Sequence, residues 1–181
     1  MGCGPRKVDP SAVGVDLLPF EGVDLVGDVY EILELLPDGC VSAVFTSHFL
    51  EHVSDLPRLM NELGRVMSIG ATLRVVVPHF SNPFYYSDPT HRVPFGLYTF
   101  SYFCDQDIFV RKVPQYALSA PFRLIDARLG FKSYRPRYVR HAFKRAFGIL
   151  INSSTFLREF YEENLCWLVS CYEIEFEIRR V

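Results

Sequence analysis

The sequence lacks several features that would each assign a protein to a class. It has no apolar run long enough to span a bilayer, no secretory signal pattern, and no internal repeat or low-complexity linker. Its five cysteines form no C-x-x-C pair, and their odd number does not indicate a disulfide framework. These absences argue against a membrane protein, a disulfide-stabilised domain and a repeat protein. We therefore expect a reduced, cytoplasmic protein.

The sequence also lacks an excess of charge of either sign. A formal net charge of −2 argues against a general affinity for nucleic acid or anionic membranes. One stretch is locally basic, and a solvated helix face explains it better than a phosphate or RNA site, because nucleic-acid readers are usually basic as whole domains. The residues of this stretch are Lys132, Arg135, Arg137, Arg140, His141, Lys144 and Arg145.

What the chain does have is enough apolar sequence for one domain. Its 181 residues are 49% hydrophobic and 15% aromatic, which is sufficient for a sizeable core. Many aromatic residues follow residue 80, where they could line a pocket or simply pack. We expect a single domain in three parts: a core over residues 1–79, an acceptor loop and cap over 80–115, and a strand-helix-helix-strand unit over 116–181.

The centre of the sequence predicts a βαβ unit. Residues 41–46 and 71–77 are apolar strand patterns, and between them a helix begins at Ser54 as N-cap and stops at Gly70. The second strand is so apolar that we expect it to be covered on both faces. Because open α/β sheets bind ligands at the carboxyl ends of their strands, Ser47 and His48 are candidates for a binding site.

Glycines and acids precede this unit in an ordered series. Gly2 and Gly4 predict a tight turn, and the strand patterns over 12–16 and 23–28 each end in an acid. Nucleotide-binding α/β folds place such a turn where the backbone approaches the ligand, and an acid at the next strand end to bind ribose hydroxyls. Asp16 alone would be more common as a turn residue, but in this series the ligand role is favoured.

Together these motifs resemble the Rossmann-like (class I) S-adenosylmethionine-dependent methyltransferases, closest to methyltransferase type 11. The resemblance covers residues 1–104 and implies a mostly parallel sheet with helices on both faces and an antiparallel C-terminal strand. It implies S-adenosylmethionine as cofactor. The residues implied to bind it are Gly2, Cys3 and Gly4 at the methionine moiety, Asp16 and Leu17 at the ribose and adenine, Asp28 and Val29 at the adenine, and Ser47 and His48 at the methyl end.

The family's first strand is missing or truncated, since only Met1 precedes the glycine turn. Its absence would leave backbone groups unpaired on two neighbouring strands, at about 1–3 kcal/mol for each buried group. Either the native chain is longer, or the strands over 12–16 and 41–46 pair directly, or a second molecule fills the gap. A homodimer is the favoured expectation.

A long polar loop follows the second strand of the βαβ unit and is the place for an acceptor. His79, Asp88 and His91 are candidate catalytic or substrate-orienting residues there, although a turn that only caps the next helix is an alternative. Tyr85 and Tyr86 either wall the pocket or pack. The acceptor itself is not identified, and a small molecule or saccharide is favoured.

The C-terminal part predicts a strand over 122–129, helices over 138–151 and 156–168, and a closing edge strand over 172–178. One rival chemistry is a zinc hydrolase, because His48, Glu51 and His52 match H-x-x-E-H. That signature belongs inside a long helix, whereas here a strand ends at Thr46, so we expect no metal site. A binding protein without catalysis and an NAD-dependent enzyme are the other rivals. The missing third glycine argues against the second of these.

Overall fold

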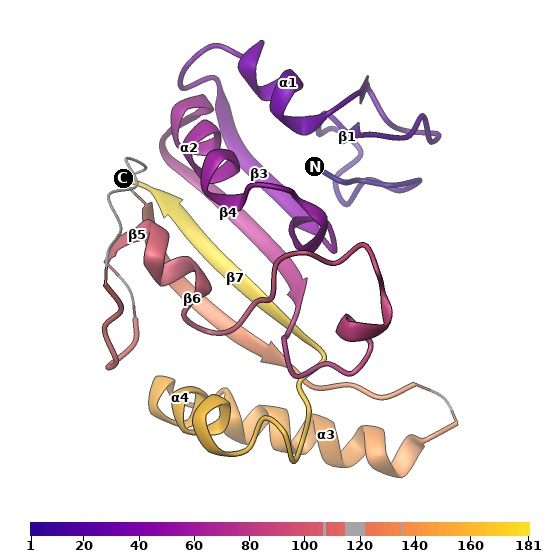
Figure 1. Cartoon of the computed structure of the whole chain (residues 1–181), viewed down its shortest axis with the longest axis vertical. Coiled ribbons are helices and arrows are strands. Elements are labelled where there is room, and N and C mark those ends of the chain that lie inside the picture. The colour runs from indigo at the N-terminus through magenta and orange to yellow at the C-terminus, as the bar shows by residue number, and fades with distance from the viewer. Residues whose placement is uncertain (107, 115–121, 135) are drawn as a thin grey trace.

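In the described residues the main sheet has five strands, in the order β3-β4-β7-β6-β5 (Figure 1). The computed structural model describes residues 1–106, 108–114, 122–134 and 136–181. β3 is parallel to β4 and β5 to β6, whereas β7 is antiparallel to both of its neighbours. The strands are β3 (Val41–Ser47), β4 (Met67–Pro78), β5 (Cys104–Gln106), β6 (Phe122–Gly130) and β7 (Glu173–Arg180).

The expected mostly parallel sheet with an antiparallel C-terminal strand is therefore confirmed. The position expected for that strand is wrong, because β7 lies between β4 and β6 and not at an edge. The alternation of β7 buries Ile174, Phe176 and Ile178 completely on one face, which is why it can occupy the centre of the sheet. The sequence-based boundary between cap and C-terminal part, at 115 and 116, lies outside the described residues.

Within the described ranges, four α-helices and three short 3₁₀ turns accompany the sheet. Asp55, not Ser54, caps the start of α2 by accepting a hydrogen bond from the backbone nitrogen of Arg58. Gly70, expected to stop this helix, lies within β4, where the register between β3 and β4 is irregular. The helices are α1 (Val29–Glu34), α2 (Leu56–Val66), α3 (Tyr138–Ile151) and α4 (Thr155–Asn164); the 3₁₀ turns are Leu50–His52, Tyr85–Ser87 and Thr99–Phe103.

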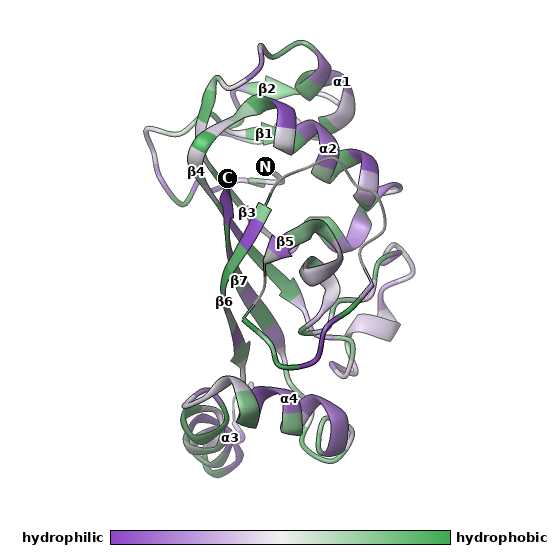
Figure 2. Cartoon of the chain, turned by 90° about the vertical axis from the view of Figure 1, so that its left-hand side faces the viewer, coloured by the Kyte–Doolittle hydropathy of each residue, from purple (hydrophilic) through white to green (hydrophobic). Residues whose placement is uncertain are grey.

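In the part of the chain that the structure describes, the helices leave part of one face of the sheet open. Figure 2 shows the sheet close to edge-on, with α2 on one side and α3 and α4 beyond one end. On the buried side Leu73, Val75 and Val77 are fully enclosed. On the other side Arg74 and Glu175 are exposed. β4 therefore buries its side chains mainly on one face. The sequence predicted burial on both faces because Val76, on the more exposed face, is apolar and half-buried.

The two N-terminal strands form a separate small sheet. β1 (Val15–Asp16) pairs in parallel with β2 (Leu25–Val26), and among the described residues neither strand pairs with β3. A groove of about 1130 Å³ lies between β3 and this small sheet, with apolar side chains of α1 along its floor. The expectation that the strands over 12–16 and 41–46 could close the gap by direct pairing is wrong for this chain.

The first residues of the chain bridge the groove by hydrogen bonds to both of its sides. The ammonium group of Met1 donates to the carbonyl oxygen of Phe45 in β3 at 2.8 Å, and the backbone nitrogen of Cys3 donates to that of Val15 in β1 at 3.3 Å. The segment from Met1 to Cys3 therefore lies as the carboxyl end of a strand between β3 and β1 would lie.

Candidate functional site

The glycine turn sits at the carboxyl ends of β1 and β3. Gly2 has a φ of 58° and Gly4 a φ of 54°, in the left-handed region that favours glycine. A Cβ atom on Gly2 would lie 2.5 Å from Cβ of Phe49, so this position also requires a glycine for space. No atom lies within 4 Å of a Cβ placed on Gly4, so the second glycine of the turn faces open space.

Asp16 holds the turn in place. Its Oδ2 accepts a hydrogen bond of 2.8 Å from the backbone nitrogen of Gly4, and its Oδ1 one of 3.0 Å from Leu18. A carboxylate offers about four acceptor positions, so Asp16 keeps acceptor capacity for a ligand. Its neighbour Leu17 is 67% exposed, as expected of a residue available to a ligand.

The second acid of the series lies beside Asp16. The backbone nitrogen of Gly27 donates to the carbonyl oxygen of Asp16 at 3.0 Å, which brings Asp28 to the same edge. Asp28 caps α1 by accepting 2.8 Å from the backbone nitrogen of Tyr30. Val29 is buried in the first turn of that helix, so its side chain packs in the core behind Asp28.

Ser47 and His48 end β3 next to the glycine turn. His48 has a φ of 51°, a conformation uncommon for a residue with a side chain. Its Nε2 lies 3.4 Å from Oε2 of Glu173 and its Nδ1 lies 3.5 Å from Oε1 of Glu51. The hydrogen bond to Glu173, followed by that to Glu51, raises the pKa of His48 to about 9 against the lowering effect of burial. His48 is therefore an imidazolium at neutral pH.

The loop after β4 carries the predicted acceptor-side residues. Oδ1 of Asp88 accepts from the hydroxyl of Thr90 at 2.6 Å, and these Thr90 hydrogen bonds lower the pKa of the exposed Asp88 carboxyl. Oδ2 of Asp88 lies 3.7 Å from Nε2 of His91. Nδ1 of His91 lies 2.8 Å from the carbonyl oxygen of Tyr85. Since a carbonyl only accepts, Nδ1 carries the proton and Nε2 keeps its lone pair.

Glu51 and His52, from the turn after β3, lie close to Asp88 and His91. The rings of His52 and His91 have centroids 4.8 Å apart, and the backbone nitrogen of Arg92 donates to the carbonyl oxygen of Glu51 at 2.7 Å. Asp88 and His91 are therefore brought together with Glu51 and His52, as the sequence did not indicate. The H-x-x-E-H pattern did mark two of these residues, but it paired them with His48 and required a helix where only the 3₁₀ turn Leu50–His52 exists.

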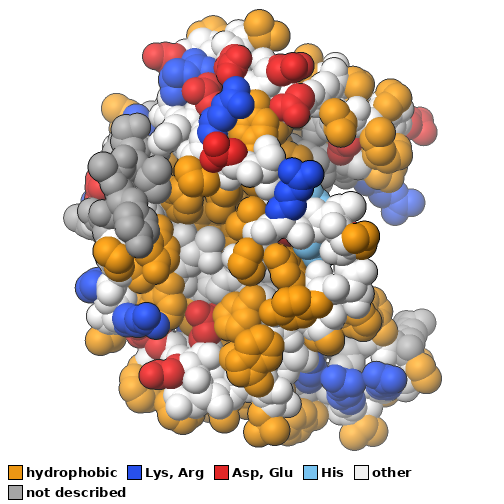
Figure 3. Space-filling view, in the orientation of Figure 1, with side chains coloured by type: hydrophobic (Ala, Val, Ile, Leu, Met, Phe, Trp, Pro, Cys, Tyr) orange, Lys and Arg blue, Asp and Glu red, His pale blue; other side chains and the backbone are white. Residues whose placement is uncertain are grey.

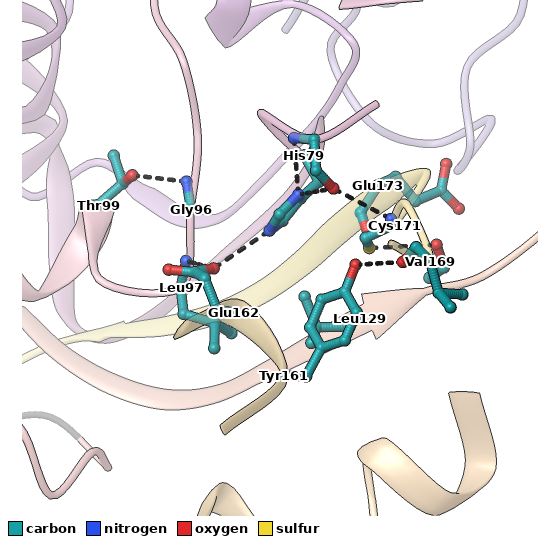
Figure 4. Close-up of polar contacts among 12 residues, drawn as sticks. His79, Gly96, Leu97, Thr99, Leu129, Tyr161, Glu162, Val169, Cys171 and Glu173 are labelled. Atoms are coloured by element: carbon teal, nitrogen blue, oxygen red, sulfur yellow. Dashed lines mark hydrogen bonds and ion pairs between the residues drawn. The ribbon is translucent and has the colours of Figure 1, made fainter. Parts of the chain in front are cut away.

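His79 is not part of this group. Its ring is fully buried, accepts from the backbone nitrogen of Ser81 at Nδ1 over 2.9 Å, and meets Oε2 of Glu162 from Nε2 at 3.2 Å (Figure 4). The same carboxylate oxygen accepts from the backbone nitrogen of Leu97 at 2.7 Å. These contacts tie the end of β4 to α4 and leave the ring no nitrogen for a substrate, so they favour a structural role.

The second half of the basic stretch belongs to α3, at the end of the molecule away from the small N-terminal sheet (Figure 1). Figure 3 shows Lys and Arg side chains gathered over α3, and Arg140 and Arg145 are exposed there as expected. The expectation of a solvated face is wrong for Lys144, which is buried and donates to the carbonyl oxygen of Ser170 at 2.6 Å. The same end exposes many large apolar side chains. They are Val139, Phe143, Ile149 and Leu150 on α3, Phe156 and Phe160 on α4, and Trp167 and Leu168 after it. Arg135 of the basic stretch lies outside the described residues.

Part of the sequence is similar to a known protein family. Residues 7–75 match the family model described as methyltransferase domain. No curated protein sequence matches the chain. No helix in the described ranges has the length and apolar character that crossing a bilayer requires.

Solved structures share the fold at low sequence identity. A SAM-dependent methyltransferase from Archaeoglobus fulgidus superposes with a TM-score of 0.57 at 19% identity, over 93% of this chain and 75% of that one. The YcgJ protein from Bacillus subtilis superposes with a TM-score of 0.52 at 16% identity, over 93% and 82% of the two chains.

Proposed function

We propose that this chain, a Rossmann-like methyltransferase domain by its fold and by the match over residues 7–75, transfers a methyl group from S-adenosylmethionine to a small molecule or a saccharide. The observation that carries the proposal is the hydrogen bond between the turn at Gly4 and the carboxylate of Asp16. It joins the two features that hold a nucleoside at the carboxyl edge of such a sheet.

The donor lies along this edge in the proposal. The glycine turn faces the methionine moiety, Asp16 accepts from the ribose hydroxyls, and Asp28 lies beside the adenine. The remaining contacts are those of Cys3, Leu17, Val29, Ser47 and His48. The protonated His48 faces the carboxylates of Glu51 and Glu173, so its positive charge is compensated within the protein and does not repel the sulfonium strongly.

The reaction needs alignment more than covalent chemistry. A lone pair on the acceptor forms the new bond to the methyl carbon, and the electrons of the sulfur–methyl bond stay on sulfur as S-adenosylhomocysteine leaves. The protein holds nucleophile, methyl and sulfur in line and excludes water. If the acceptor loses a proton, Nε2 of His91 can take it, because Nδ1 already donates to Tyr85. Asp88, next to that nitrogen, stabilises the imidazolium so formed.

The acceptor loop favours a compact acceptor over a polyanion. Phe84 is 58% exposed and Tyr86 is 65% exposed beside the buried Tyr85, which offers aromatic surface to a ligand. Asp88, on the same loop, adds an exposed acid, and hydrogen bonds from Thr90 lower its pKa. A net charge of −2 for the whole chain also disfavours nucleic acid.

Calorimetric titration with S-adenosylhomocysteine tests the donor site, and transfer of labelled methyl groups to a panel of small molecules and saccharides tests the activity. We expect binding of one equivalent and transfer to at least one acceptor. Binding without transfer to any acceptor class would support a binding protein instead, and the absence of binding would overturn the proposal.

We also propose a cytoplasmic location and a homodimeric state for the protein. Cys3, Cys40, Cys166 and Cys171 carry free thiols, which supports a reducing, cytoplasmic compartment. The exposed apolar side chains of α3 and α4 and the open edge of β3 support a homodimer, because contiguous apolar surface of this kind marks interaction sites.

A further inference from the structure

Three side chains with metal-binding atoms converge between the turn after β3 and the loop after β4. Glu51, His52 and His91 each offer one ligand atom, and these atoms all lie within 4.8 Å of one another. In a tetrahedral zinc site, ligand atoms are about 3.3 Å apart, since each lies about 2.0–2.1 Å from the metal. Small side-chain rotations therefore bring the three atoms to binding distance.

The two histidine rings are already oriented for such a site. Nδ1 of His91 donates to the carbonyl oxygen of Tyr85, which leaves the lone pair on Nε2. Nδ1 of His52 lies 2.9 Å from the hydroxyl of Thr90, and that hydroxyl donates to Asp88 at 2.6 Å. Thr90 therefore accepts from Nδ1–H of His52, so the Nε2 of His52 also keeps its lone pair. Metal-binding histidines are oriented by hydrogen bonds of this kind from the other ring nitrogen.

The buried carboxylate of Glu51 is an independent observation that points to a cation at this place. Its side chain is 1% exposed, and its Oε2 has no hydrogen-bond partner among the described residues. Oε1 faces Nδ1 of His48 at 3.5 Å and Nε2 of His52 at 4.0 Å, which does not satisfy Oε2. A buried carboxylate oxygen without a partner is costly, and a cation would satisfy it.

We propose that Glu51, His52 and His91 bind a divalent transition-metal ion. Two imidazoles and one carboxylate are a donor set that suits zinc and its neighbours better than magnesium, which prefers oxygen ligands. Three protein ligands leave a coordination position open for water or an acceptor oxygen. Asp88, with Oδ2 3.7 Å from Nε2 of His91, is close enough to join as a fourth ligand.

This site differs from the H-x-x-E-H arrangement and from the sequence-based expectation of no metal. Nε2 of His48 faces Glu173 and its Nδ1 faces Glu51, so His48 contacts a ligand but is not one of the three converging residues, and His91 from a distant part of the sequence takes its place. The inference does not depend on methyl transfer, because metal binding is measured directly. Nε2 of His91 has a single lone pair, so with metal bound it is a ligand and does not take a proton from the acceptor.

Titration of the metal-depleted 181-residue protein with Co²⁺ and Zn²⁺ tests it. The visible absorption of Co²⁺ reports its coordination, and calorimetry gives the affinity for Zn²⁺. We expect one equivalent of metal with a dissociation constant below about 10 μM. His52→Ala, His91→Ala and Glu51→Gln should each weaken binding at least tenfold, since loss of even a supporting partner costs about 10–100-fold.

His141→Ala is the matched control, because His141 lies on α3, away from this group, and its loss should leave the affinity unchanged. Circular dichroism of each variant confirms that it is folded, and the isosteric Glu51→Gln decides if an alanine variant is not. Binding that is equally strong in wild type and in all folded variants, absorption bands from cobalt–thiolate bonds, or no binding at 100 μM metal would each overturn the proposal.

Discussion

The carboxylate of Asp16 lies 2.8 Å from the backbone nitrogen of Gly4, so one side chain both fixes the glycine turn and faces the expected ribose. Asp16→Ala should therefore weaken S-adenosylhomocysteine binding by about 1–3 kcal/mol, or roughly 5- to 150-fold, through the loss of acceptors for the hydroxyls and of the turn's anchor. Calorimetry measures this. Asp38→Ala removes an exposed acid elsewhere and should leave the affinity unchanged. Equal affinities for wild type and Asp16→Ala would contradict the donor site.

His91 should matter for turnover more than for the donor. Because its Nε2 lies on the acceptor side, His91→Ala should lower kcat by about 100-fold or more, the usual contribution of a positioned acid–base group. The affinity for S-adenosylhomocysteine should change less than threefold. Steady-state kinetics and calorimetry on the same preparation separate the two effects. A parallel loss of both quantities would place His91 in the donor site instead.

His79 should matter for stability. His79→Ala removes a buried ring that bonds Ser81 and Glu162, and we expect a loss of about 2–3 kcal/mol in the free energy of unfolding. Urea denaturation gives the value, with His141→Ala as a histidine control that should cost less, because its half-buried ring accepts one hydrogen bond, from the backbone nitrogen of Ser133. If His79→Ala were as stable as wild type but inactive, the ring would have a catalytic role after all.

Asp126 should give the stability a dependence on acid pH. Burial raises the pKa of Asp126, but hydrogen bonds from Arg128 and Arg158 outweigh it and lower the pKa. A carboxyl with a lowered folded pKa stabilises the protein above its unfolded value of about 3.9, and this contribution is lost as the pH falls through the folded pKa. Asp126→Asn should therefore cost about 1 kcal/mol at pH 7 and progressively less below pH 4. Thermal unfolding at several pH values checks this, and a constant difference between the two proteins across that range would rule it out.

The exposed apolar end should support a homodimer. Light scattering of the 181-residue chain should give twice the mass of one chain, and the double change Ile149→Asp with Phe156→Asp should reduce it to one, because charges in an apolar interface are costly. Ile69→Asp introduces a charge at an exposed position on β4 and should leave the dimer intact. A monomeric wild type would exclude the dimer.

Local patterns predicted the elements of this fold better than their arrangement. The helix predicted over 138–151 lies where expected, and the strand predicted over 41–46 from its apolar composition extends one residue further, to Ser47. The central place of β7 depends on pairings with residues about a hundred positions earlier, such as Thr72 with Arg179, which periodicity does not encode. The same applies to coverage of the sheet, because half-buried outward residues such as Val76 resemble buried ones.

In the candidate site, too, contacts within one local series could be predicted from the sequence, and contacts between distant loops could not. Asp16 and Gly4 were recognised because both stand in an ordered local series, and they do meet in space. His91 and Asp88 were predicted to lie together on the loop after β4, but their meeting with Glu51 and His52 depends on how two loops pack. His79 looked equally suitable in the sequence, and only its burial against Glu162 distinguishes it.

The central position of β7 also decides the order in which the protein can fold. Residues 173–180 lie between β4 and β6, so the β3–β4 pair and the β6–β5 pair remain two separate ribbons until that segment has docked. Pairing at this sequence separation is slow, because the loop entropy is lost before any contact compensates for it. During synthesis the apolar faces of both ribbons stay open until residues 173–180 emerge, which makes the nascent chain dependent on protection from aggregation.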